Sequence, residues 1–191
     1  MICLKIIEQT YKWNGSLTKR ASTKYIILHH RATNGDVQSI HNTHLNNGWS
    51  GIGYHFYVRK DGSIYRGRPI DKVGAHTTNY NSVSIGVCFE GNFENEIMSS
   101  AQIKSGQKLI SCLKSLYPNA GIKRHRDFNS TACPGKNFPF EEIKKGDTTV
   151  TVNEAKEIIK KRAGLENDTI NFLLCYKYGE ELLIKLAKAM K

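Results

Sequence analysis

Short apolar runs separated by polar turns dominate the first part of the chain. Residues 25–28 (YIIL) are apolar and rich in β-branched side chains, and a pair of histidines follows them. Similar runs occur at 54–58, 63–66 and 83–89, and the pair Asp61-Gly62 separates the second run from the third. Such runs are typical of β-strands, and an Asp-Gly turn favours a hairpin. We therefore predict strands in these four segments.

Two further segments carry apolar residues at helical spacing. Asp36 can cap a helix that runs to about Leu45, where an Asn-Asn-Gly sequence favours its end. Ser99 or Ser100 can begin a second helix, which Pro118 ends. Because strands and helices alternate, the predicted fold class is α/β with a mixed sheet.

The composition changes near residues 145–149, where we predict a domain boundary between 1–147 and 148–191. The second part has an all-helical pattern. Asn153 and Asp168 can each cap a helix, and the acids at 180–181 suit the first turn of a third. So small a helical core is marginal alone. We therefore expect this domain to be stabilised by packing against the main domain or against a partner.

Size and charge narrow the classes of function. The 191 residues suffice for one ordinary domain and a small appendage, and no apolar run approaches the roughly 18 residues of a membrane span. The first residues do not resemble a signal peptide, so we expect synthesis in a cytoplasm and release by another factor.

The net charge of +11 favours a polyanionic partner, either nucleic acid or an anionic cell-wall polymer. No known nucleic-acid-binding signature is present, which disfavours the first.

The cysteine pattern points away from disulfides. The chain has five cysteines, an odd number, and no pair has CxxC spacing: Cys3, Cys88, Cys112, Cys133 and Cys175. Without an export signal this argues against a disulfide framework. We expect buried, catalytic or metal-binding cysteines instead.

A set of two histidines and one cysteine could hold a metal. His125 lies in a short basic segment, 121–126, that leads into a loop. Cys133 follows eight residues after His125. His29 or His30 would complete the set, but alternation along a strand lets only one of them serve easily. Zinc accepts such ligands, and a fourth position left to water makes the site catalytic. On spacing alone this is a weak indication, because His125 could be a surface histidine and Cys133 a buried small hydrophobe.

A rival metal pair is His41 and His44, at positions i and i+3 of the first predicted helix. No glutamate is placed between them as in HExxH, and no third ligand is evident. We therefore favour one packed and one solvated histidine over a metal site.

Six short motifs occur in a fixed order. They are ILHH (27–30), GWS with GYHF (48–56), VGAHT (73–77), NYN with SIGV (79–87), GNF (91–93), and HRD with TACPG (125–135). Together they resemble the N-acetylmuramoyl-L-alanine amidase family of phage lysozymes and animal peptidoglycan recognition proteins. The resemblance covers about residues 24–140. Each motif is weak alone, but six at compatible spacings are very specific.

The resemblance implies a mixed central β-sheet flanked by helices, with one Zn²⁺ at the floor of a groove. It implies His29, His125 and Cys133 as the metal ligands. It also implies catalytic roles for Tyr54 and for Thr131, a position that is lysine in some phage enzymes. Because threonine lacks that charge, we expect weaker oxyanion stabilisation from its side chain.

The resemblance further implies that His76 and Asn81 contact the peptide stem of the substrate, with His30 as a weaker candidate. Each role has a structural alternative. Tyr54 could be a core aromatic, the Thr131 hydroxyl could cap its own backbone, and turn chemistry could explain residues 76 and 81.

The function implied is hydrolysis of the amide bond between N-acetylmuramic acid and L-alanine in bacterial peptidoglycan. We expect a phage or prophage endolysin that reaches the wall through a holin, with 148–191 binding the cell wall. A non-catalytic peptidoglycan-binding protein and an intracellular wall-recycling amidase are the alternatives.

Overall fold

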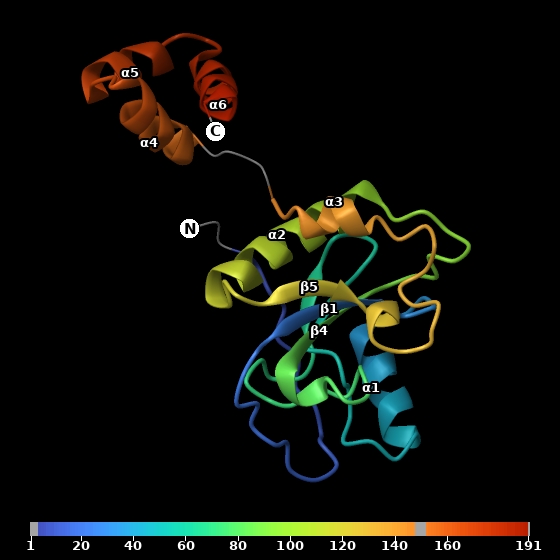
Figure 1. Cartoon of the computed structure of the whole chain (residues 1–191). Helices are drawn as coiled ribbons and strands as arrows, with labels where there is room; N and C mark the ends of the chain where they lie inside the picture. Colours follow the sequence, from blue (N-terminus) through green and yellow to red (C-terminus); the bar gives the residue numbers. More distant parts are fainter. Residues whose placement is uncertain (1–3, 148–151, 191) are drawn as a thin grey trace. The chain divides into compact units, whose positions relative to one another are not determined.

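The computed structural model describes residues 4–147 and 152–190 (Figure 1). The chain divides into two compact units, 1–147 and 148–191. The predicted boundary segment 145–149 lies partly outside the described residues, as does Cys3. None of the helices in the described part is long and apolar enough to cross a membrane.

The first unit is built on a five-stranded mixed sheet in the order β3-β2-β4-β1-β5. β1 pairs in parallel with β4 and β5, β2 pairs in parallel with β4, and β3 is antiparallel to β2. The predicted mixed sheet is therefore confirmed. The strands are β1 (Tyr25–His30), β2 (Phe56–Val58), β3 (Ile64–Arg66), β4 (Ser84–Phe89) and β5 (Gly121–Arg124).

Helices cover both faces of this sheet. α2 (Ser100–Leu116) and the short α3 (Phe140–Lys144) contribute to the main core, together with Phe56, Val87 and Phe89. α1 (Val37–Asn46) packs in a second cluster with Tyr57 and Cys88. Because neighbouring residues of a strand point to opposite faces, α1 and α2 lie on opposite sides of the sheet (Figure 1).

The predicted helix starts are correct in this unit. The Asp36 carboxylate accepts the Ser39 N–H at 2.7 Å, and the Ser99 hydroxyl accepts the Gln102 N–H at 3.2 Å. The sequence did not reveal β5, because this edge strand reads GIKR and carries no apolar run. It also did not reveal α3, which spans five residues, too few for a periodic pattern.

The second unit consists of α4 (Val152–Ala163), α5 (Asn167–Leu174) and α6 (Gly179–Ala189). Its helical class was expected, but two details differ. Asn153 lies inside α4, and Asp168 lies inside α5 with Glu166 as the N-cap. The core consists of Ala155, Ile159, Ile170, Leu183 and Ala187, whereas Leu182 is exposed.

Candidate metal centre and groove

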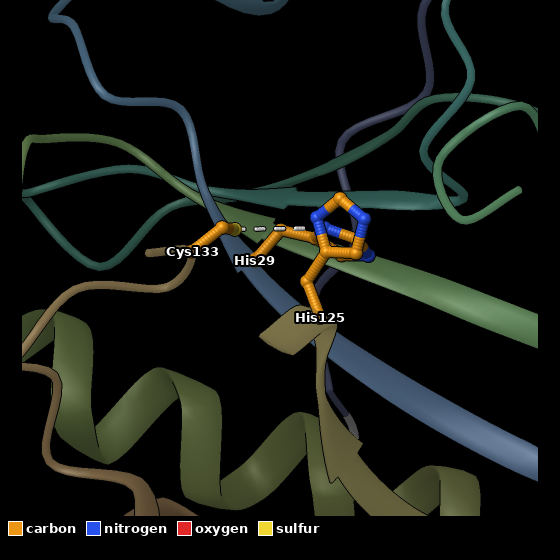
Figure 2. Close-up of side chains that lie close together, drawn as sticks. All are labelled: His29, His125 and Cys133. Carbon is orange, nitrogen blue, oxygen red and sulfur yellow. Dashed lines mark hydrogen bonds between the residues drawn. The ribbon is translucent and has the colours of Figure 1, made fainter. Parts of the chain in front are cut away.

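Three elements bring two imidazoles and one thiol together. His29 lies in β1, and His125 begins the 3₁₀ helix η2 (His125–Asp127), which directly follows β5. Since Leu28 pairs with Arg124 in the parallel register, the next residues of both strands emerge side by side. Cys133 approaches from the loop after η2, and Figure 2 shows its sulfur directed at His29. Donor atoms of the three side chains all lie within 4.8 Å of one another.

This donor set suits zinc. The Cys133 sulfur lies 3.7 Å from Nδ1 of His29, and the His29 and His125 ring centroids are 4.6 Å apart. Nε2 of His125 lies 3.2 Å from Oδ1 of Asn129, which leaves Nδ1 of His125 for a metal. A hydrogen bond at the second ring nitrogen is typical of zinc-binding histidines. Three such ligands leave one tetrahedral position open, as catalytic zinc sites require.

Burial keeps both the imidazole of His29 and the thiol of Cys133 uncharged. It lowers the pKa of His29 well below its usual value, and the positive charges of His125 and His30 act in the same direction. The imidazole therefore stays neutral, with a lone pair to offer. Burial also raises the pKa of the Cys133 thiol to about 11. A buried thiol of this kind becomes a thiolate when a divalent cation supplies the compensating charge.

Tyr54 lies next to this centre, with its ring centroid 5.1 Å from that of His29. Burial raises the pKa of its phenol well above the usual value, so the hydroxyl stays protonated and can donate a hydrogen bond. Tyr54 also lines an open cavity of about 410 Å³, a volume typical of small-ligand sites. Other residues that line the cavity are His44, Trp49, His76, Asn81 and His125.

The remaining predicted site residues, Asn81, His30 and Thr131, each hydrogen-bond to a backbone N–H group. Oδ1 of Asn81 accepts the N–H groups of His76 and Thr77 at 2.7 and 2.9 Å, so it shapes the loop that carries His76 into the cavity. His30 is not among the residues that line the cavity, and its Nδ1 accepts the Phe93 N–H at 3.2 Å. The exposed Thr131 accepts the Cys133 N–H at 3.2 Å and thereby steadies the ligand loop.

In the rival pair of α1, His41 and His44 each use Nδ1 to accept a hydrogen bond from the backbone. Nδ1 of His41 accepts the Ile52 N–H at 3.1 Å, and Nδ1 of His44 accepts the Gly53 N–H at 3.0 Å. His41 is packed, as expected, whereas His44 is half-buried in the wall of the cavity. In residues 4–147 and 152–190, the only cluster of three or more potential metal ligands is His29, His125 and Cys133.

Comparison with known proteins identifies the family. Residues 19–136 match the family model described as N-acetylmuramoyl-L-alanine amidase. The chain belongs to this family. The resemblance seen in the six motifs is thus confirmed, and the metal cluster and most of the groove lie in the matched segment of this amidase.

Three relatives show how far the similarity extends. The structure of the N-acetylmuramoyl-L-alanine amidase LysC from Clostridium intestinale URNW superimposes with a TM-score of 0.71 at 45% identity, covering 73% of this chain and 95% of LysC. The endolysin of Klebsiella phage KP32 is 36% identical over 126 residues, 61% of this chain and 83% of the endolysin. Peptidoglycan-recognition protein SC2 of Drosophila melanogaster is 36% identical over 151 residues, 70% and 82% of the two chains. The chain is therefore similar both to amidases and endolysins and to a peptidoglycan-recognition protein.

Two residues of the site were not predicted from the sequence. Asn129 contacts His125, and Trp49 lines the cavity with its ring centroid 4.6 Å from that of His44. Trp49 belongs to one of the six motifs and Asn129 lies between HRD and TACPG, but only the fold shows what they contact.

Proposed function

We propose that this amidase hydrolyses the bond between N-acetylmuramic acid and L-alanine in peptidoglycan, with one zinc ion held by His29, His125 and Cys133. The observation that carries the proposal is the convergence of these three donors within 4.8 Å, beside an open cavity that His125 helps to line. When bound, zinc supplies Lewis-acid activation of a water molecule and of the scissile carbonyl. The relatives named as amidase and endolysin support the same reaction.

The side chains around the centre would position the substrate and stabilise developing charge. Because the Tyr54 phenol stays protonated, it can donate a hydrogen bond to the oxygen of the scissile amide as negative charge builds up there. Thr131 would be a second, weaker donor. His76 and the loop that Asn81 holds would form one wall for the peptide stem.

The complete ligand set favours an enzyme over a binding protein. A protein that only binds peptidoglycan needs the groove but not three metal ligands. We further propose that the substrate is the intact wall, in keeping with the phage endolysin. Soluble muropeptides would be preferred by a recycling enzyme instead.

Release of L-alanine amino termini from purified sacculi tests the proposal. The wild-type protein should release them, lose this activity when zinc is removed by a chelator, and regain it when zinc is restored. Cys133→Ser should abolish both zinc binding and release, whereas Cys175→Ser, which changes an exposed cysteine in the other unit, should affect neither. Undiminished release by Cys133→Ser, or a wild type that binds sacculi without releasing termini, would contradict the proposal.

A further inference from the structure

The second nitrogen of His29 meets another buried histidine. Nε2 of His29 lies 3.0 Å from Nδ1 of His76, and the two rings meet edge to face. His29 is fully buried and His76 is only 8% exposed, so solvent competes little for this contact. The Thr77 hydroxyl lies beside it, 2.9 Å from Nδ1 of His76 and 3.4 Å from Nε2 of His29.

A backbone carbonyl sets the direction of the hydrogen bonds that follow. The Ser84 hydroxyl donates to the Tyr80 carbonyl oxygen at 2.7 Å, so its oxygen is left to accept from Nε2–H of His76, 3.4 Å away. Nδ1 of His76 is then an acceptor for Nε2–H of His29. The consequence is that Nδ1 of His29, which faces Cys133, carries the lone pair that a metal requires.

The fold reserves space for the His76 ring. A Cβ atom added at Gly86 would lie 2.6 Å from two ring carbons of His76, and one added at Gly74 would lie 2.5 Å from Cδ2. Neither position can carry a side chain unless the ring moves. Both glycines belong to motifs recognised in the sequence, and this contact gives a physical reason for them.

We propose that His76 is a positioning residue of the metal centre, which holds His29 in the Nε2–H tautomer and in the orientation that binds zinc. The inference rests on the proposed zinc site and adds to it a role for His76 beyond lining the groove. Such outer contacts orient ligands, and their loss typically weakens metal affinity by about 10- to 100-fold.

Two variants separate positioning from packing. In His76→Asn, the side-chain oxygen can replace Nδ1 as the acceptor, whereas His76→Phe fills the slot without an acceptor. We expect zinc affinity, measured by competition with a chromophoric chelator, to fall about 10- to 100-fold in His76→Phe and to be largely restored in His76→Asn. The control His41→Phe changes another buried histidine, whose ring nitrogens hydrogen-bond to backbone groups, and should leave zinc affinity unchanged.

Two further measurements test the inference if the His76→Phe protein does not fold. Ser84→Ala removes the acceptor for Nε2–H of His76, together with the hydrogen bond to the Tyr80 carbonyl oxygen, and should also weaken zinc binding, by less than His76→Phe. Nitrogen-15 NMR of the zinc-free wild type should show Nε2–H tautomers at both His29 and His76. Unchanged zinc affinity in folded His76→Phe or Ser84→Ala, or an Nδ1–H tautomer at His76, would overturn the inference. A wild type that binds no zinc would instead refute the proposed metal site.

Discussion

Acid should destabilise the catalytic unit through His55, a fully buried histidine behind the groove wall. Its Nδ1 accepts the Gly86 N–H at 3.0 Å, and its Nε2–H donates to the Lys72 carbonyl oxygen at 2.9 Å. Both ring nitrogens are thus used in the neutral form, and the Arg20 guanidinium lies 3.2 Å from Nε2. Burial is the main reason that the pKa of His55 falls to about 3.

The size of the effect follows from the two pKa values. Unfolding returns the pKa of His55 from about 3 to its usual 6.5, so the unfolded state binds the proton first as pH falls. The free energy of unfolding should therefore decrease below pH 6.5 and stop decreasing, for this group, near pH 3. Between pH 7 and pH 5, the loss due to His55 amounts to about 2 kcal/mol.

Urea unfolding at pH 7 and pH 5 measures this loss when the wild type is compared with His55→Asn. The asparagine oxygen can still accept the Gly86 N–H, but the side chain does not titrate. The variant will be less stable at pH 7, yet it should lose about 2 kcal/mol less than the wild type on acidification. Histidines distant from His55 contribute equally to both proteins and cancel in this difference. Equal losses in the two proteins would refute the reasoning.

Three other perturbations probe different parts of the molecule. Tyr54→Phe should lower kcat by about 100- to 1,000-fold, because it removes a hydrogen-bond donor to the oxyanion, while zinc content stays at one per chain; an unchanged kcat would exclude that role. Asp36→Ala should reduce the free energy of unfolding by about 1 kcal/mol through loss of the α1 cap, and urea midpoints that do not shift would contradict this. Deleting 148–191 should reduce binding to whole bacterial cells but not hydrolysis of soluble muropeptides; unchanged cell binding would leave this unit without a role in wall targeting.

The sequence predicted the parts of the fold that carry strong local patterns. The strands around 25–30 and 84–89 are buried on both faces and therefore mainly apolar, which makes them easy to recognise. The helices after Asp36 and Ser99 have capping residues that make the expected contacts. β5 lacks such a signal because it is a basic edge strand, and its neighbour in the sheet is distant in sequence.

The candidate site was predictable in composition but not in its contacts. Alternation along β1 leaves His29 and His30 equivalent as potential ligands, and only the motifs distinguished them. The fold supplies the physical difference, because His29 faces Cys133 while Nδ1 of His30 is taken by the Phe93 N–H. The link from His29 through His76 to Ser84 joins three separate segments, so no local pattern could reveal it.

The identity of the bond that is cut tests the central claim most directly. Purified peptidoglycan should be digested with protein containing one zinc per chain, and the products should be analysed by mass spectrometry. The account predicts intact glycan strands that bear unsubstituted N-acetylmuramic acid, together with free stem peptides that begin with L-alanine. Products with new reducing sugar ends, cleavage within the stem peptide, or full activity in zinc-free protein would contradict it.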